Sequence, residues 1–81
     1  MSSMVRLANI TRNNGSITCD IFPEDSPSAG HLTVAIESGE FVYSLPEGYE
    51  WCKSHVGHAR RTLLQLASEN RIPSRKLIMW Y

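Results

Sequence analysis

One segment of the chain, residues 49–70 (YEWCKSHVGHARRTLLQLASEN), is the only one long and periodic enough to predict a complete α-helix. At about 100° per residue, its apolar side chains fall on one continuous stripe. A helix must bury such a stripe against another element, and the flanking segments are typical of β-strands. The helix is therefore expected to cover the sheet formed by those strands. The stripe consists of Cys52, Val56, Ala59, Leu63, Leu66 and Ala67, with Tyr49 at its beginning.

The length of the chain limits the fold to one small domain. With 81 residues, a single core supplies only a few kcal/mol of net stability, so one helix on one sheet is about what the chain can build. No apolar run is long enough to suggest a membrane span. The first residues, MSSMVRLANI, lack the pattern of a secretion signal. We interpret residues 1–81 as a single domain and expect a cytoplasmic protein.

The first two strands are predicted at residues 4–11 and 16–22. Between them, Asn14 and Gly15 supply the positive φ values of a two-residue hairpin turn. The connection over residues 23–30 contains prolines, serines and acids, and is predicted to be exposed and mobile. Alternation in the second strand predicts one core-facing set, Ile17, Cys19 and Ile21.

Two more strands before the helix, residues 31–37 and 41–45, are predicted to form a second hairpin around a tight turn at residues 38–40. After the helix, Asn70 suits a left-handed C-terminal residue and Pro73 prevents continuation. Residues 76–81 (KLIMWY) are rich in strand formers and predict a last strand.

The predicted element order is ββββαβ, which defines a two-layer α+β fold with a mostly antiparallel sheet and one long helix on one face. A helix of about 20 residues spans roughly 30 Å, enough to cross four strands spaced about 4.8 Å apart. This crossing returns the last strand beside the first, so the expected strand order is 5-1-2-3-4.

A formal net charge of zero conceals an asymmetry between the two parts of the chain. Residues 1–50 carry a net charge of −5, and residues 51–81 carry +5. Such asymmetry indicates an anionic partner or charge-steered self-association, and the alternative is internal neutralisation between the two parts.

The basic residues support one functional hypothesis, which is nucleic-acid binding. Lys53 and Arg60 are two helical turns apart with Gly57 between them, and arginine and lysine suit phosphate oxygens. A glycine inside a helix costs about 1 kcal/mol, which suggests close approach by a partner. The alternative is a solvated helix face with Gly57 touching a neighbouring aromatic. The candidate residues are Lys53, Arg60, Arg61, Arg71, Arg75 and Lys76.

The sequence around Cys52, His55 and His58 (CKSHVGH) contains residue types that bind metals. Two histidines on one helix bind a metal best at i,i+4 spacing, whereas these are three residues apart, and Cys52 belongs to the core stripe. Catalysis by Cys52 and His55 would need a concave site and a third orienting group. We therefore expect no metal, no cofactor and no enzymatic activity, and we interpret Cys19 and Cys52 as free, buried thiols.

The leading hypothesis is a small protein-interaction module that binds a protein partner or itself through the uncovered sheet face and the terminal strand. If Met79 and Tyr81 face the core, Trp80 faces the uncovered side, together with Phe22 and Ile10. An alternative is that Trp80 packs within the monomer. The predicted anchors are Phe22, Trp51, Trp80 and Tyr81.

No motif connects the chain with a known chemistry. There is no phosphate-binding glycine loop, no paired CxxC and no RNA-binding aromatic signature. The closing pattern, HARR followed by IP and MWY, resembles small bacterial or phage proteins. It matches no family of known activity, so it implies no residue roles.

Overall fold

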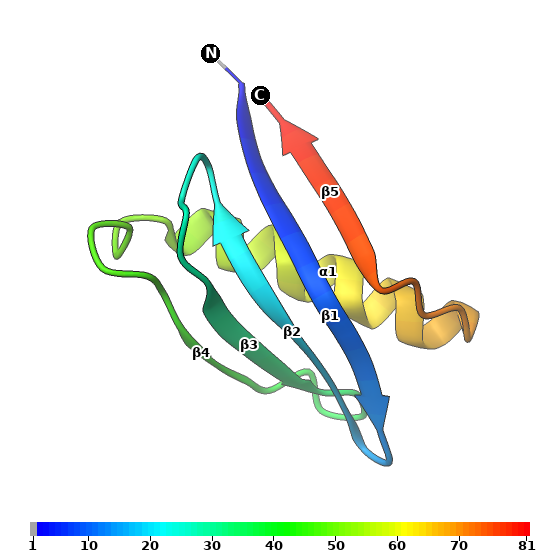
Figure 1. Cartoon of the computed structure of the whole chain (residues 1–81). Helices are drawn as coiled ribbons and strands as arrows, with labels where there is room; N and C mark the ends of the chain where they lie inside the picture. Colours follow the sequence, from blue (N-terminus) through cyan, green and yellow to red (C-terminus); the bar gives the residue numbers. More distant parts are fainter. Residues whose placement is uncertain (1) are drawn as a thin grey trace.

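The predicted elements are all present in the computed structural model, which describes residues 2–81 (Figure 1). Over these residues the chain forms β1 (Ser3–Asn13), β2 (Ser16–Pro23), β3 (Gly30–Ala35), β4 (Phe41–Ser44), α1 (Lys53–Glu69) and β5 (Arg75–Trp80). All neighbouring strands are antiparallel, in the order β4-β3-β2-β1-β5. The two-layer α+β class and the expected strand order are therefore confirmed.

The core lies between α1 and the face of the sheet that it crosses (Figure 1). All six predicted stripe residues of the helix region are buried, and so are the alternating apolar residues of β2. On β3, Leu32 and Val34 are fully buried on the same face. Within residues 2–81, no helix combines the length and apolarity needed to cross a membrane.

The helix begins at Lys53, not at Tyr49 as the periodicity predicts. A turn precedes it, in which the amide of Tyr49 donates to the carbonyl of Pro46 at 3.0 Å, and the amide of Cys52 donates to Tyr49 at 3.0 Å. Gly48 has a φ of 87°, a value that glycine adopts without strain. At the other end, Asn70 is left-handed with a φ of 56°, as expected.

A β-bulge in β1 changes which residues reach the core. The register with β2 shifts between Ala8 and Thr11, and Asn9 has a φ of 53°. The side-chain amide of Asn9 donates to Asp20 Oδ2 at 2.7 Å, which fixes the bulge. Because an extra residue reverses the alternation, Ile10 is buried on the core face with Val5. The prediction that Ile10 lies on the uncovered face is wrong.

The connection between β2 and β3 is partly buried. Ser26 is fully buried, its carbonyl accepts a hydrogen bond from Arg6 Nη2 at 2.8 Å, and its hydroxyl donates to the carbonyl of Ser28 at 2.7 Å. These bonds satisfy the polar groups that burial removes from water. The prediction of an exposed connection is therefore wrong at Ser26.

The face of the sheet opposite α1 has no covering element among the residues described (Figure 1). Side chains opposite each other in an antiparallel pair lie on the same face. The pairs Arg6 with Phe22 and Arg6 with Leu77 therefore place these three side chains on the uncovered face. The pair Met4 with Met79 lies beside them.

Candidate protein-interaction surface

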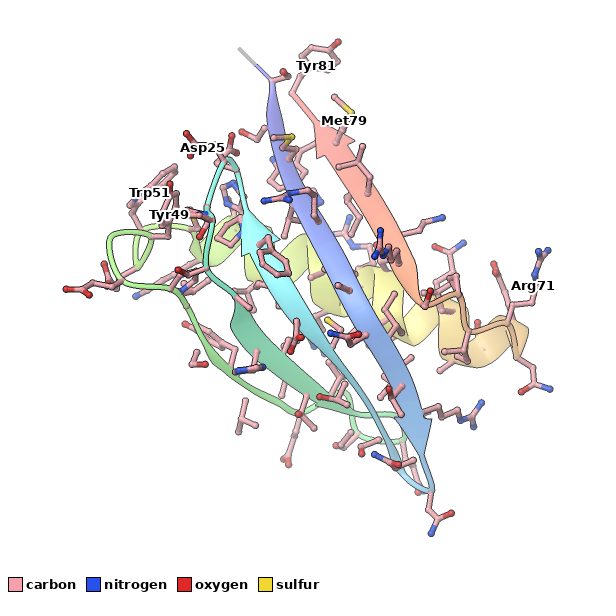
Figure 2. The ribbon with its side chains drawn as sticks, viewed as in Figure 1. Asp25, Tyr49, Trp51, Arg71, Met79 and Tyr81 are labelled. Carbon is pink, nitrogen blue, oxygen red and sulfur yellow. The ribbon has the colours of Figure 1, made fainter. Side chains whose placement is uncertain are left out.

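An apolar surface extends along β5 on the uncovered face. We call Phe22, Leu77 and Met79 the β5 patch. Leu77 is 53% exposed and Met79 is 62% exposed. Tyr81, the residue after β5, is fully exposed, and Figure 2 shows it close to Met79 at the end of the strand. Exposed apolar patches on small proteins commonly mark contacts with another molecule.

The outer edge of β5 presents backbone groups that pair with no strand in the described part of the chain. Met4 directs its backbone groups towards Glu24, the residue after β2. The Met4 amide donates to Glu24 Oε2 at 3.1 Å, and the Met4 carbonyl accepts from the Glu24 amide at 3.0 Å. Backbone direction alternates along a strand, so Val5 directs its groups towards β5, where it is opposite Ile78. In β5, Ile78 therefore bonds inwards and Leu77 and Met79 direct their amides and carbonyls outwards.

Pro23 supports the same assignment of backbone directions. It is opposite Val5 in the β1–β2 ladder, and proline has no amide proton to donate. If Val5 directs its amide and carbonyl towards β5, then Val5 and Pro23 exchange no hydrogen bonds, and the missing amide proton of Pro23 leaves no acceptor unsatisfied. Since β5 is the last strand of the sheet order, its outward groups have no strand partner within residues 2–81.

Arg6, on β1, lies between Phe22 of β2 and Leu77 of β5, within the β5 patch. Its guanidinium carbon lies 5.1 Å from the centroid of the Phe22 ring, and its Nη2 is held by the Ser26 carbonyl. A shallow depression runs from Phe22 to Leu77 beside Arg6. The prediction that Phe22 lies on the uncovered face is confirmed by the register.

Trp80 faces the helix, so its predicted orientation is wrong. Its indole stacks on the His58 imidazole at 4.0 Å between centroids, and it meets the His55 ring edge-on at 4.9 Å. The alternative in which Trp80 packs within the monomer is the one observed. The prediction missed Leu77 and Met79 because both sets of alternating residues in this strand are apolar, so no polar residue marked the solvent side.

Trp51 is exposed, but it lies away from the β5 patch. Its indole donates to the carbonyl of Gly48 at 3.2 Å and stacks on Tyr49 at 6.5 Å. Figure 2 shows Trp51 and Tyr49 together near Asp25, to the left of Met79 and Tyr81. The Tyr49 hydroxyl donates to Asp25 Oδ1 at 2.8 Å. The predicted anchors therefore do not form one surface.

His55 is buried, and its ring contacts a carboxylate. Its Nε2 lies 2.6 Å from Glu24 Oε2, and Glu24 also accepts from the Met4 amide. These two hydrogen bonds, the one from His55 first, lower the pKa of Glu24. An ionised carboxylate only accepts hydrogen bonds, so His55 Nε2 is the donor in this contact. His55 Nδ1 is buried and has no hydrogen-bond partner in the described structure.

The two cysteines are both buried and free in the described part of the chain, as expected. Burial, and then the charge of Glu24, raises the pKa of the Cys52 thiol. A thiol held in its protonated form is a poor nucleophile, since the thiolate is the reactive species. The region of Cys52 and His55 therefore has the character of a buried core and not of a nucleophilic site.

The residues around Cys52, His55 and His58 were also considered above as metal ligands. Across residues 2–81, no three or more histidine, cysteine, aspartate or glutamate side chains are grouped as metal ligands. His31 pairs with Asp20 at 2.8 Å on the uncovered face, and His58 stacks on Trp80. The histidines thus have partners other than a metal.

The six basic candidates do not form one strip. Arg60 donates from Nε to the carbonyl of Gly39 at 2.7 Å and lies 5.1 Å from the Phe41 ring, beside β4. Lys53 and Arg61 are exposed on the same helix. Arg71, Arg75 and Lys76 line a depression near β5 instead. Because β4 and β5 are opposite edges of the sheet, Arg60 is separated from the group formed by Arg71, Arg75 and Lys76.

Gly39 explains the approach of Arg60, whereas Gly57 does not. Gly39 has a φ of 77°, and a Cβ there would lie 2.6 Å from Arg60 Nη2, so the glycine makes room for this arginine. Gly57, in contrast, has open space around it: a Cβ there would meet nothing within 4 Å. The interpretation that Gly57 touches a neighbouring aromatic is wrong.

The second sheet edge, β4, also carries exposed apolar side chains. Phe41 and Tyr43 are each 42% exposed with rings stacked at 6.0 Å, and Val42 is 70% exposed. This edge is only four residues long, and the Arg60 guanidinium lies over Phe41. It is a shorter and more obstructed edge than β5.

No family model, no curated protein and no solved structure matches the chain. Its function therefore has to be inferred from its own chemistry and geometry.

Proposed function

We propose that this chain is a small protein-interaction module that binds another extended chain at the outer edge of β5. The observation that carries this proposal is the coincidence of two features on one strand. Leu77 and Met79 direct their backbone groups outwards, and they are also among the most exposed apolar side chains. An added strand would gain backbone hydrogen bonds and apolar contacts together.

The chemistry of the strand suits this mode of binding. An edge strand with free amides and carbonyls is a template for pairing, and soluble proteins usually protect such edges with charges, prolines or bulges. Along β5 the central residues are Leu77, Ile78 and Met79, with no charge or proline among them. Tyr81, the exposed residue after β5, would extend the apolar contact beyond Met79.

Nucleic-acid binding receives less support than protein binding. A strip of phosphate contacts needs cations along one surface, and binding strength grows with their number. Arg60 already has two partners within the chain, and Arg75 and Lys76 belong to the opposite sheet edge. The nucleic-acid hypothesis stays a prediction, tested by a mobility shift at low salt.

Peptide selection tests the proposed function directly. The immobilised protein is presented with a display library of random extended peptides, and recovered peptides are assayed against Met79→Pro. This proline removes an outward amide that has no strand partner within residues 2–81, so the sheet is expected to remain intact. Peptides are expected to bind the wild type and to be lost on Met79→Pro, while Val42→Lys on the β4 edge retains them. Recovery of no peptide by a protein that is monomeric in solution, or unchanged binding to Met79→Pro, would contradict the proposal.

A further inference from the structure

We infer that the strand bound at the β5 edge is β5 of a second copy of this chain, in an antiparallel two-fold dimer. This inference rests on the proposed function and names its partner. A two-fold pair must be self-complementary, because the same surface serves both copies. The residues of β5 and the one that follows it meet this requirement.

The residue order along β5 is complementary to its own reverse. Two cations, Arg75 and Lys76, come first, three apolar residues follow, and two aromatics, Trp80 and Tyr81, come last. Antiparallel pairing centred on Ile78 places each cation opposite an aromatic of the other copy. Cations and aromatic rings attract each other. The same pairing places Leu77 opposite Met79, so every apolar residue meets another.

The outward backbone groups allow this register. Leu77 and Met79 both point outwards, so a pair between Leu77 of one copy and Met79 of the other exchanges two hydrogen bonds. Ile78 then faces Ile78 of the second copy across a pair without hydrogen bonds. The two sheets become one continuous antiparallel sheet, and the two β5 patches adjoin on its uncovered face.

Charge favours this arrangement over its alternatives. Parallel pairing in register would place Arg75 beside Arg75 and Lys76 beside Lys76, and like charges directly opposite are destabilising. The formal net charge of the chain is zero, so two copies approach without overall repulsion. A two-fold pair also consumes both β5 edges, which closes the assembly at two copies.

Oligomeric state gives the first part of the test. Size-exclusion chromatography with light scattering at several concentrations is expected to show a reversible dimer for the wild type. Leu77→Lys is expected to be monomeric, because it places two new charges in the interface, while Val42→Lys stays dimeric. A wild type that is monomeric at high micromolar concentration would overturn the inference.

Cysteine cross-linking gives the second part and reports the register. The Leu77→Cys and Met79→Cys variants are mixed and oxidised, because opposed Cα atoms in a hydrogen-bonded pair are about 5.5 Å apart, within disulfide range. A cross-linked heterodimer is expected from the mixture, and little from either variant alone. Cross-linking of Leu77→Cys alone, or of Met79→Cys alone, would show a shifted register and overturn the inference.

The outcome of the peptide selection separates the two proposals. A monomer that still binds selected peptides through Met79 would overturn the second-copy inference and leave the proposed function in place. A monomer that binds no peptide would overturn both. For every variant, far-ultraviolet circular dichroism establishes that the sheet and helix have formed, so that a loss of association is not a loss of folding.

Discussion

The imidazole of His58 stacks on the indole of Trp80, with ring centroids 4.0 Å apart and planes inclined by 23°. This contact joins the middle of α1 to the last residue of β5. His55 meets the same indole from one turn earlier, at 4.9 Å. The helix thereby holds the edge strand from the core face, while the opposite face of β5 has no covering element among residues 2–81.

Replacement of Trp80 tests whether this contact stabilises the fold. Trp80→Ala is expected to lower the free energy of unfolding by about 3 kcal/mol, because it removes packing against two histidine rings. Trp51→Ala is the matched control: Trp51 is 66% exposed, and its loss is expected to cost less than about 1 kcal/mol. Urea denaturation followed by circular dichroism measures both values. Equal losses for the two variants would contradict the assignment of Trp80 to the core.

The sequence was sufficient to predict the elements and their order. The apolar stripe from Cys52 to Ala67 has a helical period, and Asn14 with Gly15 marks the first turn. A helix long enough to cross the sheet then leaves one place for the last strand, beside β1. These features depend on local pattern and chain geometry, so they are readable without knowledge of individual contacts.

The side-chain directions at the sheet edge were not predictable in the same way. Alternation gives two choices for a strand, and a shift of one residue exchanges all its faces. In β5 both choices bury apolar residues, so the pairing of Ile78 with Val5 decides between them. In β1 the bulge at Asn9 reverses the alternation. A single asparagine in a strand is not enough to predict a bulge. The candidate surface therefore had to be reassigned from Trp80 to Leu77 and Met79.

The environments of two glycines predict opposite effects of the same substitution. Gly57→Ala is expected to raise the free energy of unfolding by about 1 kcal/mol, because the added methyl group meets nothing within 4 Å and alanine favours a helix. Gly30→Ala is expected to lower it by about 2 kcal/mol, because a Cβ there would collide with the Ser44 carbonyl, so β3 and β4 must shift apart. Thermal denaturation of both variants gives the two signs. A destabilised Gly57→Ala variant would indicate that something does contact this position.

The buried cysteines are expected to resist modification in the folded protein. Cys19 is 2% exposed, and burial followed by the charge of Asp20 raises its pKa to about 12. Cys52 is fully buried and its pKa is also raised. Alkylation at about pH 8 is therefore expected to modify neither thiol until denaturant is added, when both react. Intact mass spectrometry measures the extent, and Val42→Cys, at a position where the native side chain is 70% exposed, provides a rapidly modified control. Fast modification of the native wild type would show that the core opens readily.

The Glu24–His55 contact predicts a loss of stability in acid. The hydrogen bond from His55, followed by that from the Met4 amide, lowers the pKa of Glu24 below its ordinary value of 4.5, and these effects outweigh partial burial and the nearby charge of Asp25. The unfolded chain then takes up a proton before the folded protein does as the pH falls. The stabilising contribution is therefore complete above pH 4.5 and is lost as the pH falls through the lowered pKa. Glu24→Gln is expected to show a smaller decrease in unfolding free energy over this acidic range, measured by urea denaturation at a series of pH values. Identical pH profiles for the wild type and Glu24→Gln would mean that the carboxylate does not stabilise the fold through His55.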